Sequence, residues 1–191
     1  MIIYKAITGV IILMNRDDKY DPPTFFSTQW KHWKTALEGH PCNACKEMHG
    51  KIYSYDDLPS PAPPLHPNCR CVIEPMLAVL VGLATKDGNS GADWWIRHFG
   101  SLPANYITET ALRKLGWDRG DSPAKFAPGR MVTREIYWSR NGHLPQKPGR
   151  IWYEADINYY SGKRNGHRIV WSNDGLMFVT YDHYRTFIEV N

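Results

Sequence analysis

The C-terminal third of the chain alternates short apolar runs with turn-forming residues. β-branched and aromatic residues concentrate in runs at positions 136–138, 151–157, 168–172, 176–181 and 186–190. Asn-Gly, Pro-Gly, Ser-Gly and Asn-Asp-Gly sequences stand between the runs, and such residues favour the tight turns of hairpins. The pattern therefore predicts strands that short connections join into an antiparallel sheet.

Helical signals come directly before these strands. Residues 92–99 predict a helix that ends at Gly100. Residues 108–115 predict a second helix, with Thr108 as its N-cap and Gly116 as the residue that terminates it. Helices followed by strands are typical of an α+β domain, in which N-terminal helices pack on an antiparallel β-sheet.

The first ninety residues differ in composition from this domain. Residues 1–40 show weak periodicity and predict only a strand or short helix, whereas residues 41–75 are rich in Cys, His and Pro and predict short elements held by a cross-link. Residues 76–90 pass from an apolar stretch into a polar, glycine-bearing run typical of a linker. We therefore predict a small Cys/His-rich module at 1–75, a linker at 76–90 and the α+β domain at 91–191.

No apolar run reaches the ~18–20 residues that a membrane-spanning helix requires. The longest covers residues 76–84, so we expect a soluble protein with no membrane partner. An apolar run at residues 5–14 is followed by polar residues 15–18 in place of the small-residue cleavage site of a secretion signal. We interpret that run as a strand or a truncated element.

Charge is unevenly distributed along the chain. The formal net charge is +4, and residues 91–191 carry 14 Lys and Arg against 10 Asp and Glu, whereas residues 1–90 carry 9 of each. The C-terminal half is therefore the better candidate for a polyanionic partner.

All four cysteines fall between Cys42 and Cys71. The spacing of Cys42 and Cys45 suits tetrahedral zinc, and His66, Cys69 and Cys71 follow in one short segment, so five candidate ligands compete for four positions. The preferred set is Cys42, Cys45 and Cys69 with either His66 or Cys71. Two disulfides are the alternative, with three possible connectivities, and export of the protein would favour them.

The C-terminal half also carries groups suited to chemistry at a phosphodiester. Glu154, Arg164, Arg168 and His183 lie on successive predicted strands or at their ends, so a folded sheet could present them on one concave face. Cleavage of RNA needs a base for the 2′-hydroxyl, an acid for the departing 5′-oxygen and fixed positive charge at the phosphate. These four side chains would supply all three.

The amino-acid sequence around these residues resembles that of the secreted bacillar ribonucleases of the barnase and binase type. The shared blocks occur in the same order, and the resemblance covers about half the chain, from near residue 92 to the end. The blocks are LPANYIT (102–108), LGW (115–117), APG (127–129), EADINY (154–159) and DHYRTF (182–187).

This resemblance implies the microbial ribonuclease fold and a guanyl-preferring endoribonuclease that acts through a 2′,3′-cyclic phosphate. Glu154 aligns with the general base of the family and His183 with its general acid, and Arg164 and Arg168 align with the arginines that bind phosphate. Catalysis needs no cofactor in this scheme, so a zinc ion would be structural. An acidic, barstar-like inhibitor protein is an implied partner besides the RNA substrate. The substrate-binding positions that the resemblance implies are Tyr184, Tyr137, Ser139, Arg140 and Asn141.

Two positions depart from the family. Glu109 stands where the family has a lysine that helps to hold the phosphate. Loss of one such electrostatic contact typically lowers the rate on the order of a hundredfold, so we expect reduced activity unless another cation takes the role. The candidate replacements are Lys114, Lys125 and Arg130. In the guanine-binding loop, Asn141 replaces a glutamate and offers only a neutral acceptor, which weakens the expected guanine preference.

Residues 33–75 resemble the C-terminal part of phage minor head (head-morphogenesis) proteins. The shared sequence motifs are WKTAL (33–37), CNAC (42–45), HGKIY (49–53) and PPLHPNCRC (63–71). The resemblance implies a phage-derived or toxin-delivery context, with phage head or toxin-delivery proteins as partners and a carrier module ahead of a ribonuclease. The protein would then be a secreted or delivered toxin, or be associated with a phage particle.

An alternative from another functional class is a phage structural protein whose ribonuclease-like domain binds nucleic acid without cleaving it. Glu109 would mark the lost catalysis in that case. Incubation of the protein with RNA in EDTA separates the two hypotheses.

Overall fold

The structure is a computed structural model, which describes residues 20–38 and 41–191. The strand or truncated element expected at residues 5–14 lies outside these described residues. The N-terminal elements are β1 (Thr24–Lys34), α1 (Asn43–Met48), β2 (Ile52–Ser54) and β3 (Val72–Val79). The chain continues with the 3-10 helix η1 (Gly88–Ser90), α2 (Ala92–Phe99), β4 (Tyr106–Thr108), α3 (Glu109–Lys114), α4 (Pro123–Phe126), β5 (Met131–Ile136), β6 (Trp152–Asp156), β7 (Arg168–Ser172), β8 (Met177–Thr180) and β9 (Ile188–Val190).

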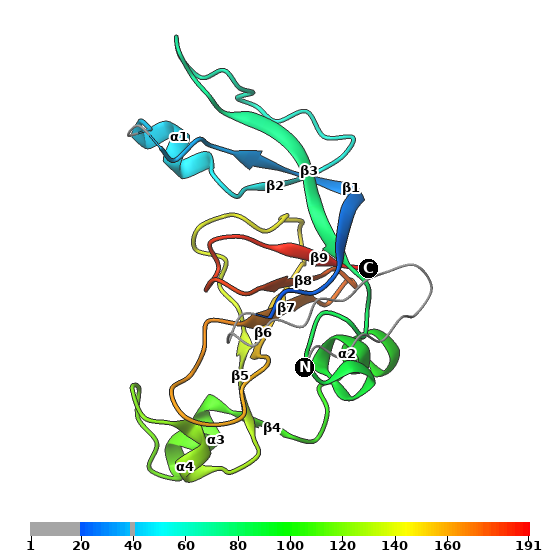
Figure 1. The fold of residues 1–191 in the computed structure, drawn as a ribbon, viewed down its shortest axis with the longest axis vertical. Helices are drawn as coiled ribbons and strands as arrows, with labels where there is room; N and C mark the ends of the chain where they lie inside the picture. Colours follow the sequence, from blue (N-terminus) through cyan, green and yellow to red (C-terminus); the bar gives the residue numbers. More distant parts are fainter. Residues whose placement is uncertain (1–19, 39–40) are drawn as a thin grey trace, which may run out of the picture.

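The described strands form one large sheet in the order β2-β1-β3-β9-β8-β7-β6-β5-β4 (Figure 1). Neighbouring strands run antiparallel, except that β3 is parallel to β9 and β4 is parallel to β5. These two pairs correct the prediction of a purely antiparallel sheet. The parallel β4 and β5 are possible because α3 and α4 form the crossover between them, and both helices lie beside β4 in Figure 1. The protein thus has a mixed α/β fold with a large sheet and few helices.

Both predicted helices are confirmed, together with the residues that end them. Helix α2 stops at Gly100, whose φ of +66° is left-handed. Helix α3 begins after Thr108, whose hydroxyl accepts a hydrogen bond from the Ala111 N–H at 3.0 Å, and Gly116 follows it with φ +94°. No helix in the described ranges is long and apolar enough to cross a membrane.

Four of the predicted strand runs contain β6, β7, β8 and β9. The prediction at 136–138 was wrong, because β5 starts earlier and ends at Ile136. The register of β5 against β6 shifts between Thr133 and Glu135, and Glu135 has a left-handed φ of +68°. This bulge turns the chain out of the ladder, so Tyr137 and Trp138 enter a loop.

The hydrophobic core is shared between the N-terminal elements and the C-terminal part of the sheet. Ile52 and Met76 pack with Phe178 and Phe187 in one buried cluster. A second cluster contains Val79 of β3 together with buried residues of α2, β6, β7, β8 and β9. The two sequence regions therefore bury part of their apolar surface against each other.

Strand β3 lies along the edge of β9. Ala78 is opposite Glu189, and the Val79 carbonyl accepts a hydrogen bond from the Asn191 N–H at 2.9 Å. The pairing covers backbone groups that β9 would otherwise expose at a sheet edge. The domain boundaries stay a prediction; residues 76–90 contain the end of β3, the buried Ala84 and η1.

Candidate functional site

Glu154 is a buried carboxylate in the middle of β6. The Tyr184 hydroxyl donates a hydrogen bond to its Oε2 at 2.5 Å, and Nη1 of Arg134 lies 3.5 Å from its Oε1. One neutral and one cationic donor therefore fix the orientation of the carboxylate. A carboxylate held in this way can accept a proton from a correctly placed hydroxyl.

His183 and Tyr184 lie between β8 and β9 in a turn with left-handed backbone, at φ +61° and +68°. The Asp182 carboxylate stabilises the turn by accepting hydrogen bonds from two following backbone N–H groups, at 3.1 and 3.0 Å. The His183 N–H donates to the Gly166 carbonyl at 3.1 Å, and a Cβ atom at Gly166 would come within 3.3 Å of His183. The imidazole is left exposed, with its centroid 5.0 Å from that of Tyr184.

Tyr184 thus contacts both titratable groups, since it bonds to Glu154 and its ring lies beside His183. Burial lowers the pKa of His183, and the positive charges of nearby arginines lower that pKa further. Those arginines are Arg168, Arg134 and Arg164. The negative charge of Glu154 acts in the opposite direction.

Asp156 is a fully buried carboxylate that holds two of the predicted arginines. Arg164 donates to it through Nε at 2.5 Å and Nη2 at 2.6 Å, and Arg168 donates through Nε at 2.9 Å. Nη1 of Arg168 also donates to the carbonyls of Asn165 and His167, at 2.9 and 2.6 Å. The guanidinium groups are therefore held rigidly beside His183 rather than free in solvent.

Glu109, at the start of α3, is surrounded by arginines. Its Oε1 accepts hydrogen bonds from Arg113, the shorter at 2.9 Å, and its Oε2 accepts one from Arg134 at 2.7 Å. Arg119 lies 3.7 Å from the same carboxylate. Burial raises the pKa of Glu109, but the hydrogen bonds and charges of Arg113 and Arg134 outweigh it and leave that pKa lowered.

Arg134 connects the two carboxylates of the site. Its Nε bonds to Glu109 at 2.7 Å, while its Nη1 lies 3.5 Å from Glu154, and its side chain is 37% exposed. The sequence suggested three cations as replacements for the family's lysine. None of the three is among the residues that line the two hollows described below. They are Lys114, Lys125 and Arg130, and the last of these donates to the carbonyl of Ala104.

Two adjacent hollows together form the candidate groove, and both include Arg119 and Arg134. The first hollow is lined by Glu109, Thr110, Arg113, Arg119, Arg134, Glu135, Ile136, Tyr137, Trp138, Arg140, Glu154 and Tyr184. The second is lined by Trp117, Arg119, Gly120, Asp121, Arg134, Lys163, Arg164, Asn165, Gly166, Arg168 and His183. All four residues predicted to be catalytic therefore line one or other hollow.

Three of the predicted base-binding residues lie beside the groove with Tyr184. The rings of Tyr137 and Tyr184 stack with centroids 5.2 Å apart. Ser139 and Arg140 line a further hollow next to Tyr137. The hydroxyl of Ser139 is buried and has no hydrogen-bond partner among residues 20–38 and 41–191.

The side chain of Asn141 contacts His143 and not the groove. Its Nδ2 lies 2.9 Å from Nδ1 of His143, and its Oδ1 accepts a hydrogen bond from the His143 N–H at 3.3 Å. It lines neither hollow of the groove. The structure therefore does not bring this residue to the carboxylate, although the sequence analysis grouped it with the base-binding loop.

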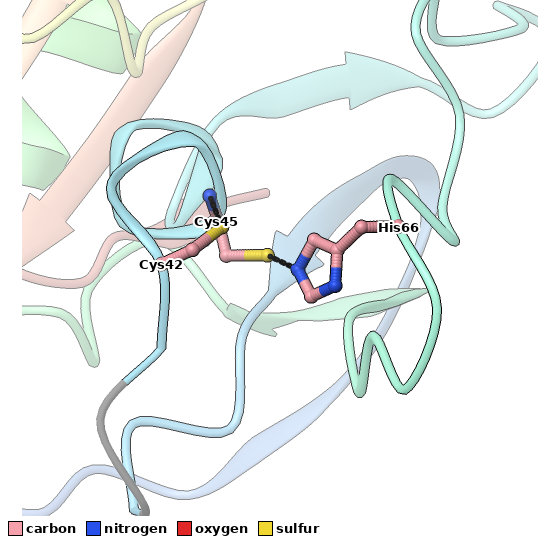
Figure 2. A group of neighbouring side chains, drawn as sticks. All are labelled: Cys42, Cys45 and His66. Atoms are coloured by element: carbon pink, nitrogen blue, oxygen red, sulfur yellow. Dashed lines mark hydrogen bonds between the residues drawn. The ribbon is translucent and has the colours of Figure 1, made fainter.

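The predicted metal ligands lie together in the N-terminal region. Cys42, Cys45 and His66 form one cluster, whose sulfur and nitrogen atoms all lie within 4.8 Å of one another (Figure 2). Cys45, Cys69 and Cys71 form a second cluster under the same limit, so Cys45 belongs to both. All four cysteines are free thiols in the structure.

The sequence analysis did not single out Asp156, Arg119 or Arg134. Asp156 belongs to the EADINY block, so the resemblance contained a signal for it. The position of Arg134 relative to Glu109 depends on how α3 and β5 meet, because the two residues are distant in sequence. Arg119 lies between α3 and α4.

Comparison with known proteins matches both halves of the chain to families. Residues 96–191 match the family described as ribonuclease, and residues 26–74 match the family described as Phage Mu protein F like protein. A ribonuclease from Heyndrickxia coagulans is 46% identical over 101 residues, which are 52% of this chain and 91% of that relative. Ribonucleases from Bacillus intermedius and Bacillus pumilus are 46% identical over 101 residues as well, covering 52% of this chain and 61% of each relative. Both resemblances seen in the sequence are confirmed.

Proposed function

Through residues 96–191 this chain belongs to the ribonuclease family, and from that membership we propose that it cleaves single-stranded RNA by transphosphorylation. Glu154 accepts the proton of the 2′-hydroxyl, and the 2′-oxygen forms a bond to phosphorus. The bond from phosphorus to the 5′-oxygen breaks, and His183 donates the proton that this leaving oxygen takes up. The products are a 2′,3′-cyclic phosphate and a free 5′-hydroxyl.

The contact that carries this proposal is Tyr184, which bonds to the carboxylate of Glu154 and lies beside the ring of His183. This shared neighbour supports the proposal that the base and the acid act on one phosphodiester in the groove. Hydrolysis of the cyclic phosphate would use the same two residues with their roles exchanged, because a deprotonated acid becomes a base.

Arg164 and Arg168 stabilise the negative charge that gathers on the phosphorane oxygens. Their bonds to the buried Asp156 support this role, because cations that are already oriented need no rearrangement during the reaction. Side chains supply the base, the acid and the cations in this scheme, so the proposed reaction has no step that requires a metal.

Arg134 replaces the lysine of the family in this proposal. It is a half-exposed cation beside Glu154, and Glu109 holds its Nε at 2.7 Å. Glu109 then acts as a positioning residue whose own charge is balanced by arginines. The carboxylate that the sequence suggested would oppose catalysis instead orients a cation toward the phosphate.

We propose that the enzyme prefers guanine and discriminates less strictly than the family pattern implies. Tyr137 offers an aromatic ring at the groove, and Arg140 is an exposed cation that lines the same hollow. Asn141 is neutral and is bonded to His143, so it gives the guanine edge no charged acceptor.

A role as a toxin follows as part of this proposal. A ribonuclease active inside its producer would destroy the producer's own RNA, so we propose an acidic, barstar-like inhibitor that covers the arginine-lined groove. The Phage Mu F-like segment at residues 26–74 supports association with phage head or toxin-delivery proteins.

The test is incubation of the full chain with an RNA oligonucleotide in EDTA, with products mapped by mass spectrometry. Cleavage that leaves 2′,3′-cyclic phosphates is expected for the wild type. Glu154→Gln and His183→Gln should each lower the rate by about a hundred- to ten-thousandfold without loss of secondary structure. Binding of RNA without cleavage would refute the proposal and support the nucleic-acid-binding alternative.

A further inference from the structure

The Cys/His cluster lies apart from the groove, in the region that matches the Phage Mu F-like family. We propose that it is a structural zinc site whose ligands are Cys42, Cys45, His66 and Cys69, with Cys71 outside the coordination sphere. The site joins α1 to the loop that precedes β3.

The spacing of one pair of sulfur atoms fits two ligands of a single metal ion. Sγ of Cys45 and Sγ of Cys69 are 3.8 Å apart. Two thiolates at 2.3 Å from one tetrahedral zinc ion are separated by about 3.8 Å, whereas a disulfide needs about 2.05 Å. The observed separation is therefore that of two ligands of one ion rather than of a disulfide.

The imidazole of His66 is oriented as a zinc ligand. Its Nδ1 lies 2.8 Å from the carbonyl oxygen of Pro67, and only a protonated Nδ1 can donate to that acceptor. Nε2 then carries the free lone pair, and it lies 3.2 Å from Sγ of Cys45 (Figure 2). A hydrogen bond from the distal ring nitrogen to a carbonyl is the usual support of a metal-bound histidine.

Cys42 completes the set from the start of α1. Its Sγ accepts a hydrogen bond from the Cys45 N–H at 3.4 Å, so the turn between them is folded as a knuckle that directs both sulfur atoms to the same side. Cys42 is exposed whereas Cys45 is buried. The ion would therefore sit at the surface of the small core and not inside it.

Cys71 lies within 4.8 Å of Cys45 and Cys69, and it has a further partner in Thr35. The Thr35 hydroxyl donates its proton to the Cys45 carbonyl at 2.8 Å, so at 3.4 Å from Cys71 Sγ it can act only as an acceptor. Cys71 is buried in an apolar cluster that also contains Trp33 and Cys45. Its additional hydroxyl partner distinguishes Cys71 from the three proposed cysteine ligands.

A metal cross-link explains how this region keeps its shape. Among the described residues between β1 and β3, only α1 and β2 are regular, and the local buried cluster consists of Trp33, Cys45 and Cys71. So few buried residues provide little hydrophobic stabilisation, and small modules of this kind commonly depend on a metal or disulfides. The ion would connect the segment before β2 with the segment before β3.

The first experiment measures zinc in the full chain, purified without chelator, by inductively coupled plasma mass spectrometry. One zinc ion per chain and four titratable thiols after denaturation in chelator are expected. Chelation should also lower the melting temperature of the N-terminal region. A zinc content well below one per chain, or thiols missing because they are oxidised to disulfides, overturns the proposal.

The second experiment identifies the ligands by replacing zinc with Co²⁺ and recording the absorption spectrum. We expect tetrahedral d–d bands together with sulfur-to-cobalt charge transfer from three thiolates. His66→Cys should keep the metal and strengthen the charge-transfer band, whereas Cys69→Ser should lose the metal. Cys71→Ser is the matched control and should leave the spectrum unchanged.

Loss of metal or an altered spectrum in Cys71→Ser, with an unchanged spectrum in His66→Cys, overturns the proposed ligand set. RNA cleavage and far-ultraviolet circular dichroism of each variant report whether the remainder of the chain is folded. A Cys69→Ser protein that is folded by these measures and still binds one zinc ion equally contradicts the assignment.

Discussion

The phenol of Tyr184 donates a hydrogen bond to the carboxylate of Glu154 across 2.5 Å. The ring of this tyrosine also stacks on Tyr137 at 5.2 Å, so its position is set from two directions. The carboxylate consequently has one preferred orientation, and it faces the groove in which we propose that the phosphate binds.

Tyr184→Phe removes this hydrogen bond and keeps the stack. We expect kcat/KM for an RNA oligonucleotide to fall by about ten- to a hundredfold, because a hydrogen bond to a charged group contributes about 1.5–3 kcal/mol. Tyr160→Phe is a matched control, since it removes a hydroxyl that bonds at 2.9 Å to another carboxylate, that of Asp87. Equal effects of the two substitutions would contradict a special role for Tyr184.

Arg134→Ala tests whether this arginine replaces the lysine of the family. We expect kcat to fall on the order of a hundredfold, the usual effect of removing one electrostatic contact to the transition state. Arg113→Ala is the control, because Arg113 also bonds to Glu109, whereas the cation paired with Glu154 is Arg134. Its effect should be much smaller.

Glu109→Gln and the double variant with Arg134→Ala extend the same test. If Glu109 acts by positioning Arg134, the single variant loses activity and the double variant is no worse than Arg134→Ala alone. Additive losses in stopped-flow or steady-state rates would show that Glu109 acts independently. Glu109→Lys should bring no gain, because its ammonium group would face the arginines that now pair with the carboxylate.

The pH profile reports on His183. Its pKa lies below the ordinary value near 6.5 because of burial and the charges of Arg168, Arg134 and Arg164. The acid must be protonated in the cyclising step, so kcat/KM should begin to decline at a pH below that expected for an ordinary histidine. Removal of a positive charge raises the pKa, and therefore Arg134→Ala should move this basic limb to higher pH. A limb that stays in place would argue against His183 as the acid.

Asp156→Asn should affect stability and catalysis together. The carboxylate is fully buried and holds Arg164 and Arg168, so its loss leaves two guanidinium groups without their anion. Removal of one partner of a buried ion pair typically costs about 3–5 kcal/mol, which urea unfolding would detect. The folded variant should also cleave RNA more slowly, because the arginines are no longer oriented. Unchanged stability would contradict the buried network.

Asn141→Glu tests the basis of guanine preference. A glutamate adds a charged acceptor to the base-binding loop, and we expect the ratio of cleavage after guanine to cleavage after adenine to rise on the order of tenfold. Asn141→Gln is the control of similar length without charge, and it should leave the ratio nearly unchanged. Product mapping on an oligonucleotide that contains every base step measures both.

The sequence alone determined the local elements of the C-terminal half. The caps at Thr108 and Gly100 and the β-branched runs that became β6, β7, β8 and β9 act over a few neighbouring residues, so their signals are visible in the chain. The family motifs likewise named Glu154 and His183, which the fold brings to one groove.

Only the tertiary structure decided how distant residues meet. The contact of Glu109 with Arg134 depends on the packing of α3 against β5, and the parallel pairing of β3 with β9 joins residues far apart in the chain. The contact of Cys71 with the Thr35 hydroxyl likewise joins residues thirty-six positions apart. Contacts of this kind arise when the sheet closes and its core is buried, and no local pattern of hydrophobic and polar residues records them.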